Sequence, residues 1–154
     1  MSRYCLTDLG LVNALGASRA EVLRNLLSGH APGMRAESGW LHGQEVHLGQ
    51  VEAALPAVPA ELNEFDSRNN RLLLAAYEQI REPVAREIER CGAERVAVVV
   101  GSSTSGILEG ERAVSARMAS GDWPEHYHYR QQEIGAPALF LARWNQSTHA
   151  DPPL

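Results

Sequence analysis

A run of five apolar residues, Val96–Val100, leads into a small polar turn at Gly101–Gly106. Four of the five residues are β-branched, which favours a strand over a buried helix. Because apolar and polar positions do not alternate, both faces of the strand should be covered, as in the central strand of an α/β sheet. The pattern then becomes helical from Ile107 to about Ala119. A buried strand, a turn of small residues and a helix, in this order, is where open α/β sheets place their ligands.

The N-terminal pattern predicts a strand, a tight turn and a helix. Tyr4–Leu9 is mainly apolar and reads as the first strand, and the small residues of Gly10–Gly16 follow as a turn. Ser18 and Glu21 have the spacing of a capping box, in which the Ser18 hydroxyl accepts from the Glu21 N–H and the Glu21 carboxylate accepts from the Ser18 N–H. Gly29 is placed to end this helix in the left-handed conformation. One face of the helix is apolar and consists of Val22, Leu23, Leu26 and Leu27.

The middle of the chain predicts a surface excursion followed by a long helical region. From His30 to Pro59 no period persists, and within this excursion Trp40–Gly49 is predicted to form a short strand pair. Glu61–Gly92 carries apolar residues at helical spacing. Pro83 interrupts it, so we expect a kink near residues 81–82 or two abutting helices.

A third helix is predicted over Gln131–Trp144, where Pro137 is tolerable only near a first turn or a kink. Residues 145–154 show no period and end in Asp-Pro-Pro-Leu, so we expect an unfolded tail. Two predicted strands are too few to cover both faces of three or four helices. The pattern therefore indicates an α/β fold that is incomplete, with helices packed on a partial sheet.

Composition narrows the functional classes. The chain has 154 residues and a formal charge of −5, and it has no Lys/Arg block longer than two, which excludes an electrostatic footprint for nucleic acid. No apolar run approaches the roughly 18–20 residues that span a bilayer, and no signal peptide is evident, so a cytoplasmic protein is expected. Cys5 and Cys91 are then expected to be reduced, buried thiols.

No catalytic constellation is evident from the residues alone. The Gly101–Gly106 turn lacks the Lys of a P-loop, the second Gly of the dinucleotide fingerprint and the final Gly of a nucleophile elbow. Its backbone N–H groups could hold an anion at the start of the following helix, or the turn could be purely structural. No Cys or acidic cluster accompanies the six histidines in the sequence to complete a metal site. Glu109 and Glu111 are expected to be solvated.

Four blocks in order resemble the N-terminal portion of a β-ketoacyl-acyl-carrier-protein synthase, a condensing enzyme of the thiolase-like superfamily. They are Leu6–Gly16, Glu21–Gly29, Asp66–Gln79 and Val96–Ile107. The resemblance covers about residues 3–144 and so implies one partial thiolase-like domain, with 145–154 as a tail outside the family pattern. One departure is Asp8, where the family usually has Gly.

The resemblance implies that the complete protein condenses an acyl thioester with malonyl-acyl-carrier protein, in fatty-acid or polyketide-like biosynthesis. The family's catalytic cysteine lies in a T-A-C-S-S-like stretch just beyond the position of Trp144, and its two histidines lie in the second half, so this chain carries no catalytic residue and should be inactive alone. The family shapes its acyl pocket with the turn matching Ser102–Leu108, which makes Ile107 and Leu108 the expected substrate-binding residues. No cofactor or metal is implied.

Three readings of the function remain open. The first is a fragment of a condensing enzyme, whose partners would be an acyl-carrier protein and a second subunit in a homo- or heterodimer. The second is a non-catalytic partner subunit of a condensing enzyme. The third is a small α/β module that binds an anion at Gly101–Gly106.

Overall fold

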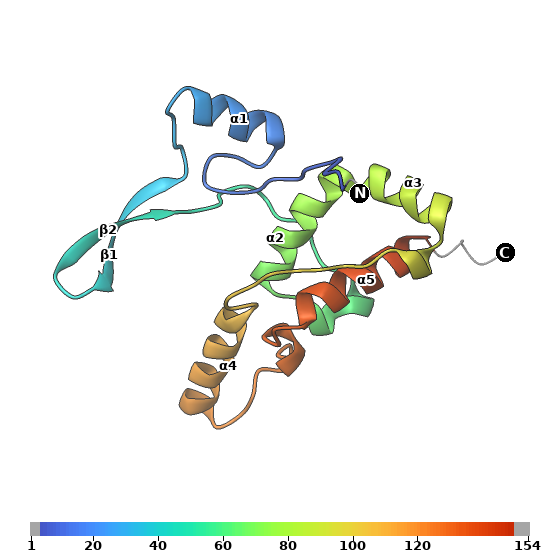
Figure 1. The fold of residues 1–154 in the computed structure, drawn as a ribbon. Helices are drawn as coiled ribbons and strands as arrows, with labels where there is room; N and C mark the ends of the chain where they lie inside the picture. Colours follow the sequence, from blue (N-terminus) through green and yellow to red (C-terminus); the bar gives the residue numbers. More distant parts are fainter. Residues whose placement is uncertain (1–3, 150–154) are drawn as a thin grey trace. The chain divides into compact units, whose positions relative to one another are not determined.

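The computed structural model describes residues 4–149 and shows an α/β chain with five α-helices and a two-stranded sheet in that range. Figure 1 shows the elements in chain order. The helices are α1 (Arg19–Leu27), α2 (Arg68–Tyr77), α3 (Arg81–Cys91), α4 (Ile107–Ser120) and α5 (Ala136–His149), and the strands are β1 (Met34–Leu41) and β2 (Gln44–Gly49). Short 3₁₀ helices lie at η1 (Ala60–Phe65), η2 (Glu78–Ile80), η3 (Ala93–Arg95) and η4 (Tyr129–Gln131).

The chain divides into two compact units. The first contains the residues up to Leu55 together with Ala75–Cys91, and the second contains Pro56–Leu74 and the residues from Gly92 onward. Helix α2 begins in the second unit and ends in the first.

In the first unit, the N-terminal segment is fastened to η2 by one side chain. The Gln79 amide donates to the carbonyls of Leu11 (2.9 Å) and Ala17 (3.0 Å) and accepts from the Leu11 N–H (3.3 Å). Gly10 lies so close to the backbone of Ala76 that a Cβ at this position would be 1.9 Å from the Ala76 carbonyl oxygen. This approach explains the need for a small residue in the predicted turn.

Helix α1 is capped nearly as its sequence predicts. The Ser18 hydroxyl accepts from the Glu21 N–H at 3.2 Å, but the Glu21 carboxylate accepts from the N–H of Ala17, one residue before the predicted donor, at 2.9 Å. Gly29 follows the helix with φ +66°, the left-handed conformation that was predicted.

The predicted apolar face of α1 is exposed in the structure. Only Val22 of the four residues is buried, and Leu23, Leu26 and Leu27 are 54%, 62% and 78% exposed. The buried side of the helix instead contains Asn25, whose amide donates to the Leu15 carbonyl. This polar anchor orients α1 so that its leucines face outward.

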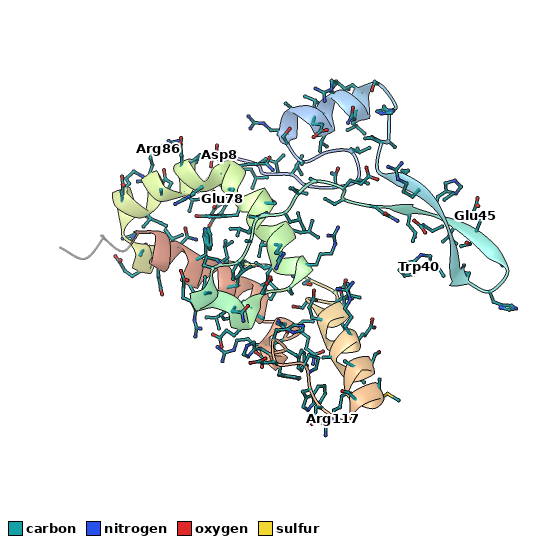
Figure 2. All side chains as sticks on the ribbon, turned by 180° about the vertical axis from the view of Figure 1, so that it is seen from behind. Asp8, Trp40, Glu45, Glu78, Arg86 and Arg117 are labelled. Carbon is teal, nitrogen blue, oxygen red and sulfur yellow. The ribbon has the colours of Figure 1, made fainter. Side chains whose placement is uncertain are left out.

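The sheet is the predicted strand pair of the excursion and not the predicted central sheet. β1 and β2 are antiparallel, with Met34 opposite Gly49 and Leu41 opposite Gln44, and the pair starts earlier in the chain than Trp40. Both strands are largely exposed, and the side chain of Trp40 is 69% exposed. Figure 2 shows Trp40 on this hairpin.

Neither predicted core strand is formed within the described part of the chain. Residues 96–100 are extended, but they pair with no strand and Val99 is 92% exposed. Residues 4–9 also pair with no strand, and Tyr4 is 95% exposed. The predictions fail for one physical reason: a central strand needs a hydrogen-bonding neighbour on each edge, and the sheet of the described chain contains only β1 and β2, paired with each other.

The long helical region breaks before Pro83, as its position requires. It consists of η1, α2, η2 and α3, and the irregular turn Glu78–Ile80 includes residue 79, whose carbonyl the Pro83 ring would meet in a continuous helix. The predicted third helix begins later than expected, at Ala136, which places Pro137 in its first turn. Residues 145–149 of the predicted tail continue α5, and residues 150–154 lie outside the described range.

The core of the second unit is aromatic. The rings of Phe65 and Phe140 are fully buried, with centroids 6.1 Å apart, and Trp144 lies 6.4 Å from Phe140. Two arginines pair with the Glu64 carboxylate and lie over the Phe65 ring, with guanidinium carbons 5.5 Å (Arg130) and 5.2 Å (Arg143) from its centroid. These contacts join α5 to η1, in the unit that also contains the Gly101–Gly106 turn.

Candidate functional site

The turn at Gly101–Gly106 is held in a defined conformation by Ser105. This residue is 6% exposed and has φ +47°, a left-handed value found at no other non-glycine residue of the described chain. Its hydroxyl donates to the Glu133 carbonyl at 2.9 Å, and its N–H donates to the Ser102 hydroxyl at 2.8 Å. The two hydrogen bonds compensate a backbone conformation that a side chain disfavours.

Two glycines allow α4 to approach the η4 segment closely. A Cβ on Gly106 would lie 2.1 Å from the Gln131 carbonyl oxygen and 2.8 Å from the Ser67 Cβ. A Cβ on Gly110, one turn further along α4, would lie 1.9 Å from the side-chain oxygen of Gln132. The start of α4 is therefore positioned by contact with backbone and side-chain atoms that leave no room for a larger residue.

Two glutamines fix the η4 segment against which α4 packs. The Gln131 amide, 4% exposed, donates to the Asp66 carbonyl at 2.9 Å and accepts from the His128 N–H at 3.1 Å. The Gln132 amide donates to the Tyr127 hydroxyl at 2.9 Å. Sequence patterns give no signal for either residue, because a side-chain amide carries no periodic signal and the Asp66 carbonyl that Gln131 contacts lies 65 positions away in the chain.

Glu109 joins α4 to the start of α2, contrary to the prediction that it is solvated. One carboxylate oxygen accepts from the Arg68 N–H at 2.9 Å, where a negative charge is favoured by the dipole of α2. The other oxygen is buried and has no hydrogen-bond partner in the described structure. The first turns of the two helices are thus linked through a carboxylate.

A second carboxylate, that of Asp66, fixes the backbone on which Gln131 depends. Both of its oxygens accept from the Arg71 guanidinium at 2.6 Å, in the two-pronged geometry that arginine and carboxylate favour. The hydrogen bond with Asp66, reinforced by the attraction between the charges, raises the pKa of Arg71 above its ordinary value. The ion pair thus joins Arg71 to the residue whose carbonyl the Gln131 amide contacts.

The predicted substrate-binding residues lie together in the first turn of α4. Ile107 is 47% exposed and Leu108 is 38% exposed, so both side chains are accessible to a ligand or to another part of a larger protein. They follow directly from the restrained Ser105 and Gly106, and the conformation of the turn therefore sets their position.

One N–H group of the turn and two at the start of α4 donate to the chain itself. The N–H of Ser105 donates to the Ser102 hydroxyl, and the N–H of Ile107 donates to the Thr104 carbonyl at 3.1 Å. The N–H of Glu109 donates to the Gly106 carbonyl at 3.1 Å. An anion bound through these three N–H groups would have to displace these bonds.

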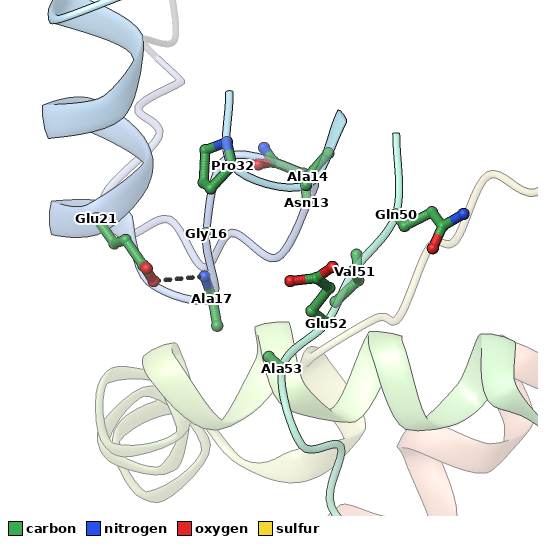
Figure 3. Close-up of a pocket in the computed structure, with 11 residues that line it drawn as sticks. Asn13, Ala14, Gly16, Ala17, Glu21, Pro32, Gln50, Val51, Glu52 and Ala53 are labelled. Atoms are coloured by element: carbon green, nitrogen blue, oxygen red, sulfur yellow. Dashed lines mark hydrogen bonds between the residues drawn. The ribbon is translucent and has the colours of Figure 1, made fainter. Parts of the chain in front are cut away.

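A separate cleft lies within the first unit, between the Asn13–Gly16 turn and the segment after β2 (Figure 3). Its acidic side chains are engaged: Glu21 accepts from the Ala17 N–H, and Glu52 pairs with Arg35. Asn13 also bonds locally, accepting from the Leu15 N–H at 2.8 Å. The cleft brings together no nucleophile and base.

The cysteines and histidines form no centre among the described residues. Cys5 is exposed, contrary to the prediction, because it lies on the extended N-terminal segment, and the half-buried Cys91 thiol donates to the Glu87 carbonyl at 2.9 Å. Within residues 4–149 no group of three or more His, Cys, Asp or Glu side chains is arranged to hold a metal ion. Over the same range no helix has both the length and the apolar character needed to cross a membrane.

Comparison with known proteins adds a related solved structure. No protein-family model matches the sequence, and no curated protein matches it. The solved structure of the ketosynthase ApeO in complex with its chain length factor ApeC, from Xenorhabdus doucetiae, contains a chain 48% identical to this one. The match covers 90% of this chain with a TM-score of 0.81, and it covers 35% of the relative, so the chain spans about a third of that relative's length.

These values confirm the resemblance seen in the four sequence blocks. An identity of 48% over 90% of the chain, with matching backbones, assigns the fold. The α/β arrangement is part of a thiolase-like ketosynthase fold, and the chain resembles a segment of a ketosynthase-like condensing enzyme.

Proposed function

We propose that this chain is a fragment of a 3-oxoacyl-acyl-carrier-protein synthase, which condenses an acyl thioester with malonyl-acyl-carrier protein. The observation that carries the proposal is the 48% identity and TM-score of 0.81 to a chain of a ketosynthase–chain length factor complex. The proposed substrates are carrier-bound acyl groups of fatty-acid or polyketide-like biosynthesis, and the proposed location is the cytoplasm. The proposed domain is residues 3–144, with 145–154 outside the family pattern.

The proposed role of the chain is to supply one wall of the acyl pocket. The exposed Ile107 and Leu108 would face the acyl chain, and Ser105 would hold them in place through its bond to the Glu133 carbonyl. The chain alone is proposed to be inactive. The thiol of Cys91 donates to the Glu87 carbonyl.

A chimera tests this function. The chain is joined to the part of the Xenorhabdus relative that lies outside the match, the chimera is incubated with acyl donor and malonyl-carrier protein, and the acyl-enzyme and 3-oxoacyl product are measured by mass spectrometry. We expect loading and condensation by the chimera and neither by the chain alone. A folded chimera that forms no acyl-enzyme would refute the catalytic proposal.

The pocket residues are tested in the same chimera. Ile107→Ala and Leu108→Ala should change the distribution of acyl-chain lengths, because removing side-chain atoms from an apolar wall enlarges the acyl pocket. Val114→Ala is the matched control, since Val114 lies on the same helix and, like Ile107, is 47% exposed. If all three variants give the wild-type distribution, the pocket assignment is wrong.

A second candidate function is that of a non-catalytic partner subunit. It is favoured by the composition of the related structure, which pairs a ketosynthase with a chain length factor. In this case the chimera would co-purify with an intact ketosynthase and would remain unacylated while its partner is loaded. Mass spectrometry of the two polypeptides after incubation with the acyl donor separates the two functions.

A further inference from the structure

We propose that Glu109 is a positioning residue for the acyl pocket: its hydrogen bond to the start of α2 fixes the first turn of α4 and thereby the selectivity for acyl-chain length. The inference rests on the proposed function, because it takes Ile107 and Leu108 as one wall of that pocket. Glu109 acts through these two neighbours and not by touching the substrate.

Glu109 belongs to the same helical turn as the two wall residues. Helix α4 begins at Ile107, so Glu109 is its third residue and directly follows Leu108. The Glu109 carboxylate accepts from the Arg68 N–H at 2.9 Å, which joins α4 to a residue 41 positions earlier in the chain. Both residues lie in the second unit, so the contact is internal to one compact unit. A shift of this turn would move Ile107 and Leu108 together with Glu109.

The contact is directional, whereas the glycine contacts of α4 are steric. The close approaches of Gly106 and Gly110 limit how near α4 can come to η4, but a glycine has no side chain with which to hold the helix. The Ser105 hydroxyl supplies one side-chain hydrogen bond, to the Glu133 carbonyl, and Glu109 supplies a second from the helix itself. Because hydrogen bonds weaken steeply when they are misaligned, the two bonds restrain the orientation of the turn.

The charge of Glu109 strengthens the connection between α4 and α2. A negative charge is favoured in the first turn of α4 and beside the first N–H groups of α2, since the dipoles of both helices are positive there. The charge also attracts the Arg71 guanidinium. After the hydrogen bond and the charge of Asp66, this attraction contributes to the raised pKa of Arg71. The start of α4 is thus joined to α2 by a hydrogen bond and by charge.

The second oxygen of the carboxylate shows that this connection has an unfavourable component. It is buried and has no hydrogen-bond partner in the described part of the chain. A buried oxygen without a donor loses the hydrogen bonds that water would make to it, a penalty that a glutamate on the surface avoids. The penalty has an explanation if the bond to the Arg68 N–H serves the position of the turn.

The first measurement uses the 154-residue chain itself. Hydrogen exchange at the Arg68 amide is compared in the wild type, Glu109→Ala and Glu109→Gln. Alanine removes the acceptor and should speed exchange of this amide about tenfold, whereas glutamine keeps an oxygen that can accept from it and should preserve the protection. Glu111→Ala is the matched control, because Glu111 is an exposed glutamate on the same helix.

The second measurement uses the chimera described above and determines the ratio of kcat/KM for a long and a short acyl donor. Glu109→Ala should change this ratio about fivefold, because the wall of the pocket is no longer held in one position. Glu109→Gln and Glu111→Ala should leave the ratio at its wild-type value. Ser18→Ala controls for a general loss of stability, since it weakens the cap of α1 in the first unit and should not change the ratio.

Each outcome decides the proposal. It is overturned if the Arg68 amide is as protected in Glu109→Ala as in the wild type, or if Glu109→Ala leaves the ratio of an active chimera unchanged. It is also overturned if Glu109→Gln or Ser18→Ala changes the ratio as much as Glu109→Ala does. A chimera that forms no acyl-enzyme refutes the proposed function and, with it, the role in selectivity. The exchange of the Arg68 amide then still decides whether Glu109 fixes the start of α4, so the two failures are distinguishable.

Discussion

Gly106 and Gly101 lie in the same turn, and the structure predicts opposite outcomes when each is replaced by alanine. A Cβ on Gly106 would lie 2.1 Å from the Gln131 carbonyl oxygen, whereas ordinary contact begins near 3.4 Å. Gln131 cannot retreat freely, because its buried amide holds the Asp66 carbonyl and the His128 N–H. Overpacking of this kind typically costs about 1–3 kcal/mol, and the rigid neighbour places Gly106→Ala in the upper part of that range.

Gly101→Ala is the matched control. A Cβ at Gly101 meets no atom within 4 Å, and its φ does not lie in the left-handed region. Because alanine restricts the unfolded chain, this substitution should be neutral or should stabilise the protein by about 0.4–1 kcal/mol. The pair thus separates a general effect of losing a glycine in this turn from the specific contact between Gly106 and Gln131.

The assay is urea unfolding followed by tryptophan fluorescence, to which Trp123 and Trp144 contribute from the unit that contains the turn. With a urea slope of about 2 kcal/mol per molar, the midpoint of Gly106→Ala should fall by about 1 M, and that of Gly101→Ala should stay or rise slightly. Equal midpoints for the two variants would refute the close packing of α4 on η4.

Three further substitutions test other contacts. Asn70→Leu should lower the free energy of unfolding by about 1–3 kcal/mol in urea titrations, because the fully buried Asn70 amide donates to the Phe65 carbonyl at 2.8 Å and leucine leaves that oxygen unpaired. Ser18→Ala should cost about 1 kcal/mol by the same assay, and Ser18→Asp should restore most of it, since aspartate also caps helices. Glu87→Gln should reduce the loss of helical circular dichroism signal that occurs when the pH is lowered to acid values. The hydrogen bond from Arg90 lowers the pKa of Glu87 below 4.5, so the pair stabilises α3 above that pH and is lost as the pH falls through the lowered value.

Local structure could be predicted from the sequence where it depends on neighbouring residues. The Ser18 cap, the left-handed Gly29, the interruption before Pro83 and the hairpin around Trp40–Gly49 all have short-range causes, and the structure contains all four. Within this group the details differ in two places: Glu21 accepts from Ala17 in place of Ser18, a shift of a single residue, and the hairpin begins at Met34, before Trp40.

Contacts between distant residues could not be predicted in this way. Ser105 bonds to a residue 28 positions away, and Glu109 bonds to one 41 positions away. Each looks in the sequence like an ordinary polar surface residue, since nothing in a local pattern records which backbone group will come within reach. The turn could therefore be identified from its resemblance to the condensing-enzyme family, whereas the hydrogen bonds that hold it rigid are evident only in the three-dimensional structure.

The valine run at 96–100 differs from these cases, because its local pattern predicts an environment that the described chain does not provide. A strand at the surface of a soluble fold is expected to alternate, since its exposed face gains nothing from apolar residues. Val96–Val100 does not alternate, although Val99 is 92% exposed. The two observations agree if the pattern reflects a fold about three times as long, of which this chain spans 35%. The leucines of α1 lead to the same conclusion independently. Leu23, Leu26 and Leu27 form an apolar stripe that the first unit leaves exposed, at a place in the sequence unrelated to the valine run. Two separate elements are thus patterned for burial and exposed in the described chain, as is expected of a segment that spans about a third of its relative's length.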